Sequence, residues 1–112
     1  MAADIDEKQE AKVFPLAAVE TCLLAELTLL AETEAQIRGI EKPKAPGIIL
    51  KMAIPLDSLS VVDVLCAVEP VMGFELKDSL VRTGGYPTIE AAMAHLMPRL
   101  ETAWKKKNGV KA

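Results

Sequence analysis

Few side chains in this sequence have the types and spacing that catalysis or metal binding requires. The only histidine is His95, and the two cysteines, Cys22 and Cys66, lie far apart along the chain. A structural zinc site needs several Cys and His ligands at short spacings, so this composition excludes one. No nucleophile is spaced to pair with His95, which we therefore expect at the surface or at the edge of the core.

Both cysteines lie inside apolar helical patterns, and a disulfide scaffold would need a denser set of them. We therefore expect two buried free thiols, each packed as a small hydrophobic side chain. The Gly84-Gly85 pair lacks the lysine and the preceding strand of a phosphate-binding loop, so it predicts a turn. Nothing in the chain resembles an enzyme active site.

One segment remains that could bear chemistry, the sequence Asp57-Ser58-Leu59 at the start of an apolar helical run. Asp or Ser at a helix start commonly caps free backbone N–H groups. Taken alone, the pair is more often a cap than a reactive site. Its role therefore depends on the elements that position it.

The first helix is predicted over about residues 15–37. Its apolar residues recur at the three- and four-residue steps of a helix with one buried face. They are Leu16, Val19, Leu23, Leu27 and Leu30, with Leu24 and Ala31 beside them. Gly39 then ends the pattern, as is typical of a helix C-terminus.

A proline-rich segment, residues 41–55, follows the first helix. Pro43, Pro46 and Pro55 exclude a regular helix there. Its apolar side chains would each lose about 1.5–3 kcal/mol if they stayed exposed. They are Ile48, Ile49, Leu50, Met52 and Ile54. We therefore expect a loop that packs across the core.

The second helix is predicted to begin at Asp57-Ser58 and to end at Gly73. Its inward stripe is predicted as Leu59, Val62, Leu65 and Cys66, with Val61, Val68 and Met72 beside it. Residues 75–82 allow at most a short helix.

The last helix is predicted to begin after Thr88, a residue typical of N-caps. Its inward residues are Ile89, Ala92, Met93 and Leu96. Because Pro98 suits a first helical position, residues 98–107 either form a separate short helix or continue with a kink, with Trp104 as their apolar anchor. The predicted fold is all-α, a small bundle of three main helices and one short helix with a long loop between the first two.

Charge and composition narrow the class of function. The 112 residues have a net charge of −3, with 8 basic and 15 acidic side chains in residues 1–97 against 5 and 1 in residues 98–112. The acidic body argues against nucleic-acid binding. No apolar run reaches the roughly 18 residues of a membrane span, and the acidic start has no signal-peptide pattern. We expect a soluble cytoplasmic domain.

The same patterns predict how the chain is divided. Residues 1–14 are expected to be poorly ordered, because most of them are polar and unperiodic. Residues 15–97 form the helical domain, and residues 98–112 form a basic C-terminal extension. Aromatic residues make up 4% of the chain, so the core is expected to be aliphatic.

The segment from Ile54 to Glu69 resembles the prosthetic-group site of acyl carrier proteins and related phosphopantetheine carriers. Their motif is Asp-Ser-Leu at the start of the second helix after a long loop, here Asp57-Ser58-Leu59. Acidic residues follow at Asp63 and Glu69, where carriers place the carboxylates that partner enzymes recognise. Gly-Phe-Glu-Leu at 73–76 resembles the turn that leaves the second helix of a carrier.

The resemblance extends over about residues 16–97, since Thr-Ile-Glu-Ala-Ala at 88–92 matches the opening of the last carrier helix. Some positions depart from the family. Pro55 stands where carriers usually have Gly, Ser60 stands where an acidic residue is common, and Pro70 is foreign to most carriers. The first helix is also longer than usual and the chain extends past the usual end, which indicates a specialised carrier.

The resemblance implies that Ser58 holds 4′-phosphopantetheine, flanked by the motif residues Asp57 and Leu59. Its thiol would carry an acyl or aminoacyl group as a thioester for enzymes of lipid or secondary-metabolite synthesis. The implied partners are a phosphopantetheinyl transferase and acyl-transfer, ligase or synthase enzymes, recognised through Asp63 and Glu69. The implied acyl pocket is lined by Leu65, Val68 and Met72. The chain itself would be no enzyme and would act as a monomer.

The alternative is a carrier-like helical module that is never modified. In that case Ser58 is only a helix cap, and the chain is a protein-interaction domain. The intact Asp57-Ser58-Leu59 motif favours the carrier, whereas Pro55 and Ser60 favour the unmodified module.

Overall fold

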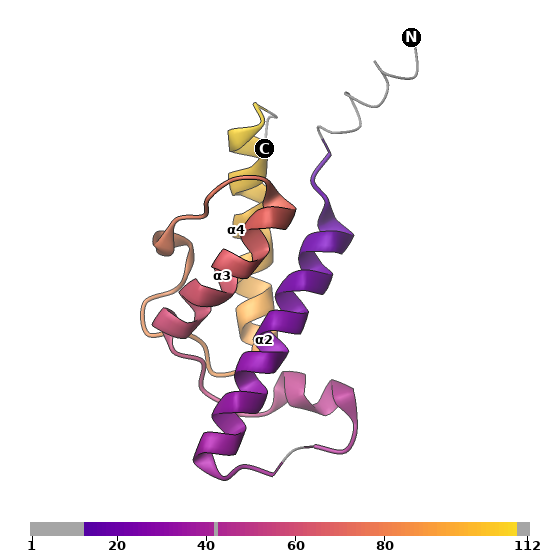
Figure 1. Cartoon of the computed structure of the whole chain (residues 1–112), viewed down its shortest axis with the longest axis vertical. Helices are drawn as coiled ribbons and strands as arrows, with labels where there is room; N and C mark the ends of the chain where they lie inside the picture. Colours follow the sequence, from indigo (N-terminus) through magenta and orange to yellow (C-terminus); the bar gives the residue numbers. More distant parts are fainter. Residues whose placement is uncertain (1–12, 42, 110–112) are drawn as a thin grey trace.

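Three α-helices form the bundle in the computed structural model, which describes residues 13–41 and 43–109 (Figure 1). They are α2 (Leu16–Arg38), α3 (Ser58–Met72) and α4 (Ile89–Lys107). Two 3₁₀ helices, η1 (Pro46–Lys51) and η2 (Asp78–Leu80), lie in the connections. The described residues contain no β-strand, only an isolated bridge between Leu56 and Tyr86. The prediction of a small all-α bundle is confirmed.

Helix α2 presents one narrow face to α3 and α4. Its buried residues follow one another at four-residue steps, so they form a single row along the helix. They are Val19, Leu23, Leu27, Ala31 and Ala35. Leu16, predicted to face inward, is 54% exposed, because Phe14 fills the core at this end. The predicted stop at Gly39 is confirmed, with φ at 72° and the Ile40 N–H donating to the Ala35 carbonyl at 2.8 Å.

Helix α3 has the predicted start and end but a different buried face. It begins at Ser58 and ends at Gly73, whose φ is 89°. The buried residues are Val61, Val64, Leu65, Val68 and Met72. The predicted inward positions Leu59 and Cys66 are wrong, since Leu59 is 77% exposed and Cys66 is exposed. Leu56, 1% exposed, takes the core position at this end in place of Leu59.

The expectation of two buried thiols is also wrong. Cys66 lies on the exposed face of α3, and Cys22 on α2 is half-buried. The Cys22 thiol points to the Ala67 carbonyl, with Sγ 3.7 Å from the oxygen. The apolar residues of α3 are dense enough to form more than one possible buried face. The helix is turned about its axis so that Cys66 faces solvent.

The proline-rich segment packs on the core as predicted. Ile49 and Ile54 are buried, and Leu50 and Met52 pack against the hydrophobic core, whereas Ile48 is 53% exposed. The segment also contains a turn of 3₁₀ helix that the prolines did not predict. Helix η1 starts with a proline at its first position, where no backbone N–H is needed.

Helix α4 runs through Pro98 without a break. A proline removes the bond to the carbonyl four residues earlier. That residue, Ala94, lies on the exposed side of the helix, where its carbonyl needs no partner within the core. The core therefore runs across residue 97, where the helical domain was predicted to end, and includes Leu100 and Trp104.

The far end of α4 packs against the residues that precede α2 (Figure 1). The Trp104 and Phe14 rings make an edge-to-face contact with centroids 6.0 Å apart. Trp104 is 5% exposed and Phe14 8%, so both belong to the core. Phe14 packs in the core, although the segment predicted to be poorly ordered, residues 1–14, included it; residues 1–12 of that segment lie outside the described part of the chain.

Within the described ranges, no helix is both long enough and apolar enough to cross a membrane.

Replacing Trp104 with alanine should cost about 3–5 kcal/mol of unfolding free energy, because it empties a buried aromatic site against Phe14. Urea unfolding followed by circular dichroism measures the loss. Thr102→Ala, an exposed position on the same helix, should change the unfolding free energy by less than about 0.5 kcal/mol. Equal stability of the two variants would show that residues 98–107 do not dock.

Candidate functional site

Ser58 is the first residue of α3, and its hydroxyl lies at the helix N-terminus. Asp57 occupies the N-cap position with extended backbone, and its carbonyl accepts the Val61 N–H at 3.1 Å. The Asp57 side chain makes no capping hydrogen bond. Ser58 is half-buried, and its hydroxyl has no hydrogen-bond partner among the described residues. The first N–H groups of α3 are therefore left without side-chain caps.

The residues around Ser58 form an exposed face. Asp57 and Asp63 are exposed, and Leu59 is 77% exposed. Asp63 and Cys66 follow Leu59 at four- and seven-residue offsets, which places all three on one side of α3. The motif residues Asp57 and Leu59 are thus exposed on either side of Ser58, and Asp63, one of the two residues predicted for partner recognition, is exposed in the first half of α3.

Glu69 lies apart from this face. It is eleven residues beyond Ser58, about 16 Å along the helix axis. One of its carboxylate oxygens accepts the Leu76 backbone N–H at 2.8 Å. This hydrogen bond therefore holds the segment that follows α3, at Leu76, to the end of the helix.

The three residues predicted to line an acyl pocket lie in the core. Leu65 is 2% exposed, Val68 0% and Met72 4%. They belong to the single cluster of buried apolar side chains that joins the helices. In this structure they are core residues of the bundle.

A backbone bridge fixes the chain immediately before Ser58. The Leu56 N–H donates to the Tyr86 carbonyl at 2.8 Å, and the Tyr86 N–H donates back to the Leu56 carbonyl at 2.9 Å. These two bonds set where α3 begins. Sequence reasoning missed this pairing, since thirty residues separate its two members and no local pattern marks either one.

Gly85 makes the bridge sterically possible. Its φ is 82°, and a Cβ there would overlap the Leu56 carbonyl oxygen and lie 3.0 Å from the Asp57 Cα. Gly84 also has a positive φ, 89°, but a Cβ there would meet nothing within 4 Å. The predicted turn at Gly84-Gly85 is confirmed, and the second glycine is also a close-approach site.

Polar contacts hold Tyr86, the second residue of the bridge, in place. The Arg82 backbone N–H donates to the Tyr86 hydroxyl at 3.0 Å, and that hydroxyl lies 2.7 Å from Nδ1 of His95. The Arg82 side chain donates from Nε to the Gly85 carbonyl at 3.1 Å and lies over the Tyr86 ring. His95 therefore sits at the core edge, as predicted, and supports Tyr86.

The environment of His95 favours its neutral form. Burial lowers its pKa below the ordinary value of 6.5, and the positive charges of Arg99 and Arg82 lower that pKa further. Because the Tyr86 hydroxyl already accepts the Arg82 N–H, its own proton is free to donate to Nδ1. A neutral ring with Nδ1 as acceptor fits this network.

Among the described residues, the surroundings of the Ser58 hydroxyl include neither a hydrogen-bonded base nor a metal-binding group. No base is hydrogen-bonded to the Ser58 hydroxyl among the described residues, so nothing activates it as a nucleophile. No group of His, Cys, Asp and Glu in residues 13–41 and 43–109 is placed to hold a metal ion.

Comparisons with protein-family models, with curated proteins and with solved structures find no significant match to this chain.

Replacing Gly85 with alanine should destabilise the fold by about 1–3 kcal/mol more than Gly84→Ala does. Both changes place a side chain at positive φ, and only the first also pushes against Leu56. Denaturant unfolding of the two variants gives the difference directly. Equal losses would mean that the close approach at Leu56 is unimportant.

The free energy of unfolding should fall as the pH drops below 6.5. A lowered folded-state pKa means that the unfolded chain binds the proton of His95 more tightly, so this contribution is complete above 6.5 and is lost below it. Urea unfolding at pH 7.5 and pH 5 measures the change. In His95→Gln the loss of unfolding free energy between pH 7.5 and pH 5 should be smaller than in the parent protein. An equal loss in that variant would contradict the attribution of this pH dependence to His95.

Proposed function

We propose that this chain is a carrier protein that holds 4′-phosphopantetheine on the Ser58 hydroxyl. The observation that supports this most is the position of Ser58 at the first residue of α3, with a hydroxyl that makes no hydrogen bond to any residue of ranges 13–41 and 43–109. A serine acting only as a cap would accept a backbone N–H, and this one does not. That difference weighs against the alternative of an unmodified interaction module.

The start of α3 suits a phosphodiester on physical grounds. Its first N–H groups have no side-chain caps, and they coincide with the positive end of the helix dipole. A phosphate joined to Ser58 would accept hydrogen bonds from them. The phosphopantetheine arm on Ser58 would extend toward solvent, because the neighbouring residues Leu59 and Asp57 are exposed.

Recognition by partner enzymes would use the exposed face around Ser58. Asp57 and Asp63 offer carboxylates to basic partners, and Leu59 offers an apolar contact between them. Each exposed ion pair is worth only about 0.2–1 kcal/mol, so such contacts speed encounter and permit fast release. A transferase and several acyl-transferring enzymes could then share this face in turn.

The proposed cargo is an acyl or aminoacyl group in thioester linkage to the thiol of the arm. An acyl chain could enter the core beside Leu65, Val68 and Met72 if α2 and α3 moved apart. Aliphatic side chains allow such repacking more readily than aromatic ones, and these three are flexible or small. In this proposal η2 takes the place of the short third helix of a four-helix carrier fold.

Incubation with coenzyme A, magnesium and a broad-specificity phosphopantetheinyl transferase should add one phosphopantetheine group per chain. In this transfer the Ser58 oxygen attacks the β-phosphate of coenzyme A, and adenosine 3′,5′-bisphosphate leaves. Intact-mass spectrometry measures the gain. Ser58→Ala should gain nothing, whereas Ser60→Ala, two residues along the same helix, should be modified like the parent.

Three results would overturn the proposal. They are no mass gain with transferases of several specificities, a gain that persists in Ser58→Ala, and a gain that maps to another residue. Circular dichroism of each variant separates loss of the acceptor from loss of the fold. The same Ser58→Ala protein tests the alternative, since an unmodified module would keep its partner binding.

A further inference from the structure

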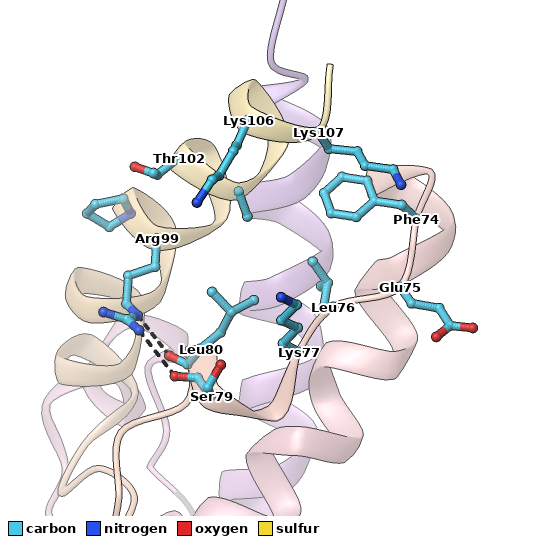
Figure 2. Close-up of a pocket in the computed structure, with 12 residues that line it drawn as sticks. Phe74, Glu75, Leu76, Lys77, Ser79, Leu80, Arg99, Thr102, Lys106 and Lys107 are labelled. Atoms are coloured by element: carbon cyan, nitrogen blue, oxygen red, sulfur yellow. Dashed lines mark hydrogen bonds between the residues drawn. The ribbon is translucent and has the colours of Figure 1, made fainter. Parts of the chain in front are cut away.

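A groove lies between the chain that leaves α3 and the second half of α4 (Figure 2). Its volume is about 750 Å³, in the range of small-ligand sites. The apolar side chains that line it are Phe74, Leu76, Leu80, Pro98 and Ala103. None of them belongs to the residues proposed above for the carrier site.

Internal contacts give the groove a fixed end. Arg99 on α4 donates from Nε to the Leu80 carbonyl at 3.0 Å and from its terminal nitrogen to the Ser79 carbonyl at 3.1 Å (Figure 2). These bonds hold η2 against the helix. At the other end the Lys107 ammonium lies 6.0 Å from the centre of the Phe74 ring. Contacts between residues 74–80 and α4 thus connect the two walls of the groove at both of its ends. The space between these contacts is open.

The charge in this open middle is positive. Lys77 from one wall and Lys106 from the other point their amino groups into the space between them, whereas Glu75 points away (Figure 2). Neither lysine forms an ion pair with a described residue. With Arg99 and Lys107, four cations line a groove with one carboxylate.

We propose that this groove binds a small amphipathic anion, a carboxylate at the end of a single hydrocarbon chain. The apolar side chains from Phe74 to Ala103 would cover the chain, and Lys77 and Lys106 would pair with the carboxylate. An apolar ligand without charge would not pair with either of the two exposed ammonium groups. A fully polar anion would gain nothing from the apolar floor.

This ligand differs from the cargo proposed for the carrier site. A thioester has lost the carboxylate charge that the lysines would recognise, so the groove would hold a free acid. The site uses the extended part of α4, residues 98–107, which gives this segment a role besides packing. The inference does not depend on modification of Ser58.

Titration of the full chain with decanoate, followed by ¹H–¹⁵N NMR, tests the proposal. Saturable shifts should concentrate in residues 74–80 and 98–107. The neutral analogue 1-decanol should bind about tenfold more weakly, and acetate should not saturate, since one lacks the charge and the other the chain. The titration is performed on Ser58→Ala, so its outcome is independent of the carrier proposal.

Charge reversal provides the matched variants. Lys77→Glu with Lys106→Glu should weaken decanoate binding by about tenfold or more, whereas Lys51→Glu on η1, another exposed lysine, should leave it unchanged. Ala103→Trp should block the groove while circular dichroism shows an intact helix content. Shifts spread over other surfaces, equal affinity for 1-decanol, or equal affinity in the double variant would overturn the proposal.

Discussion

The Leu56–Tyr86 bridge is the constraint on which the arrangement of this protein most depends. Two reciprocal backbone bonds of 2.8 and 2.9 Å hold the residue two positions before Ser58. They place Leu56 in the core, start α3 at Ser58, and leave Leu59 outside. Gly85 permits the approach, and the Tyr86 hydroxyl ties the bridge to His95 on α4. A nonlocal pairing thus decides which residues surround the candidate attachment site.

The surfaces near the two ends of α3 differ in charge. Asp57 and Asp63 lie near its first turns, and the groove beyond its last turn is lined by four cations and one carboxylate. Such separation of charge lets one small bundle present different surfaces to basic and to anionic ligands. Glu69 joins the two regions structurally, since its carboxylate fixes the chain at Leu76 where the groove begins. The proposed carrier site and the proposed groove therefore share a scaffold but no residues.

Local signals predicted the helix ends well, because capping depends on few residues. Gly39 and Gly73 have the positive φ that ends a helix, and the Thr88 hydroxyl accepts the Ala91 N–H at 3.0 Å. The buried face of α3 could not be predicted, because its valines and leucines form more than one apolar stripe. Contacts with the rest of the bundle determine which stripe is buried. The bridge and the docking of Trp104 onto Phe14 depend on residues distant in sequence. The position of Ser58 was predictable from its motif, but its missing hydrogen bond was not.

The most direct test of the carrier proposal is the mass of the protein purified from the cells that make it. Intact-mass spectrometry and fragmentation of the peptide around Ser58 measure both the presence and the place of a prosthetic group. Our account predicts a phosphopantetheine on Ser58 in at least part of the population, free or with an acyl group on its thiol. A native protein that is entirely unmodified at Ser58, in cells that modify their other carriers, would contradict it.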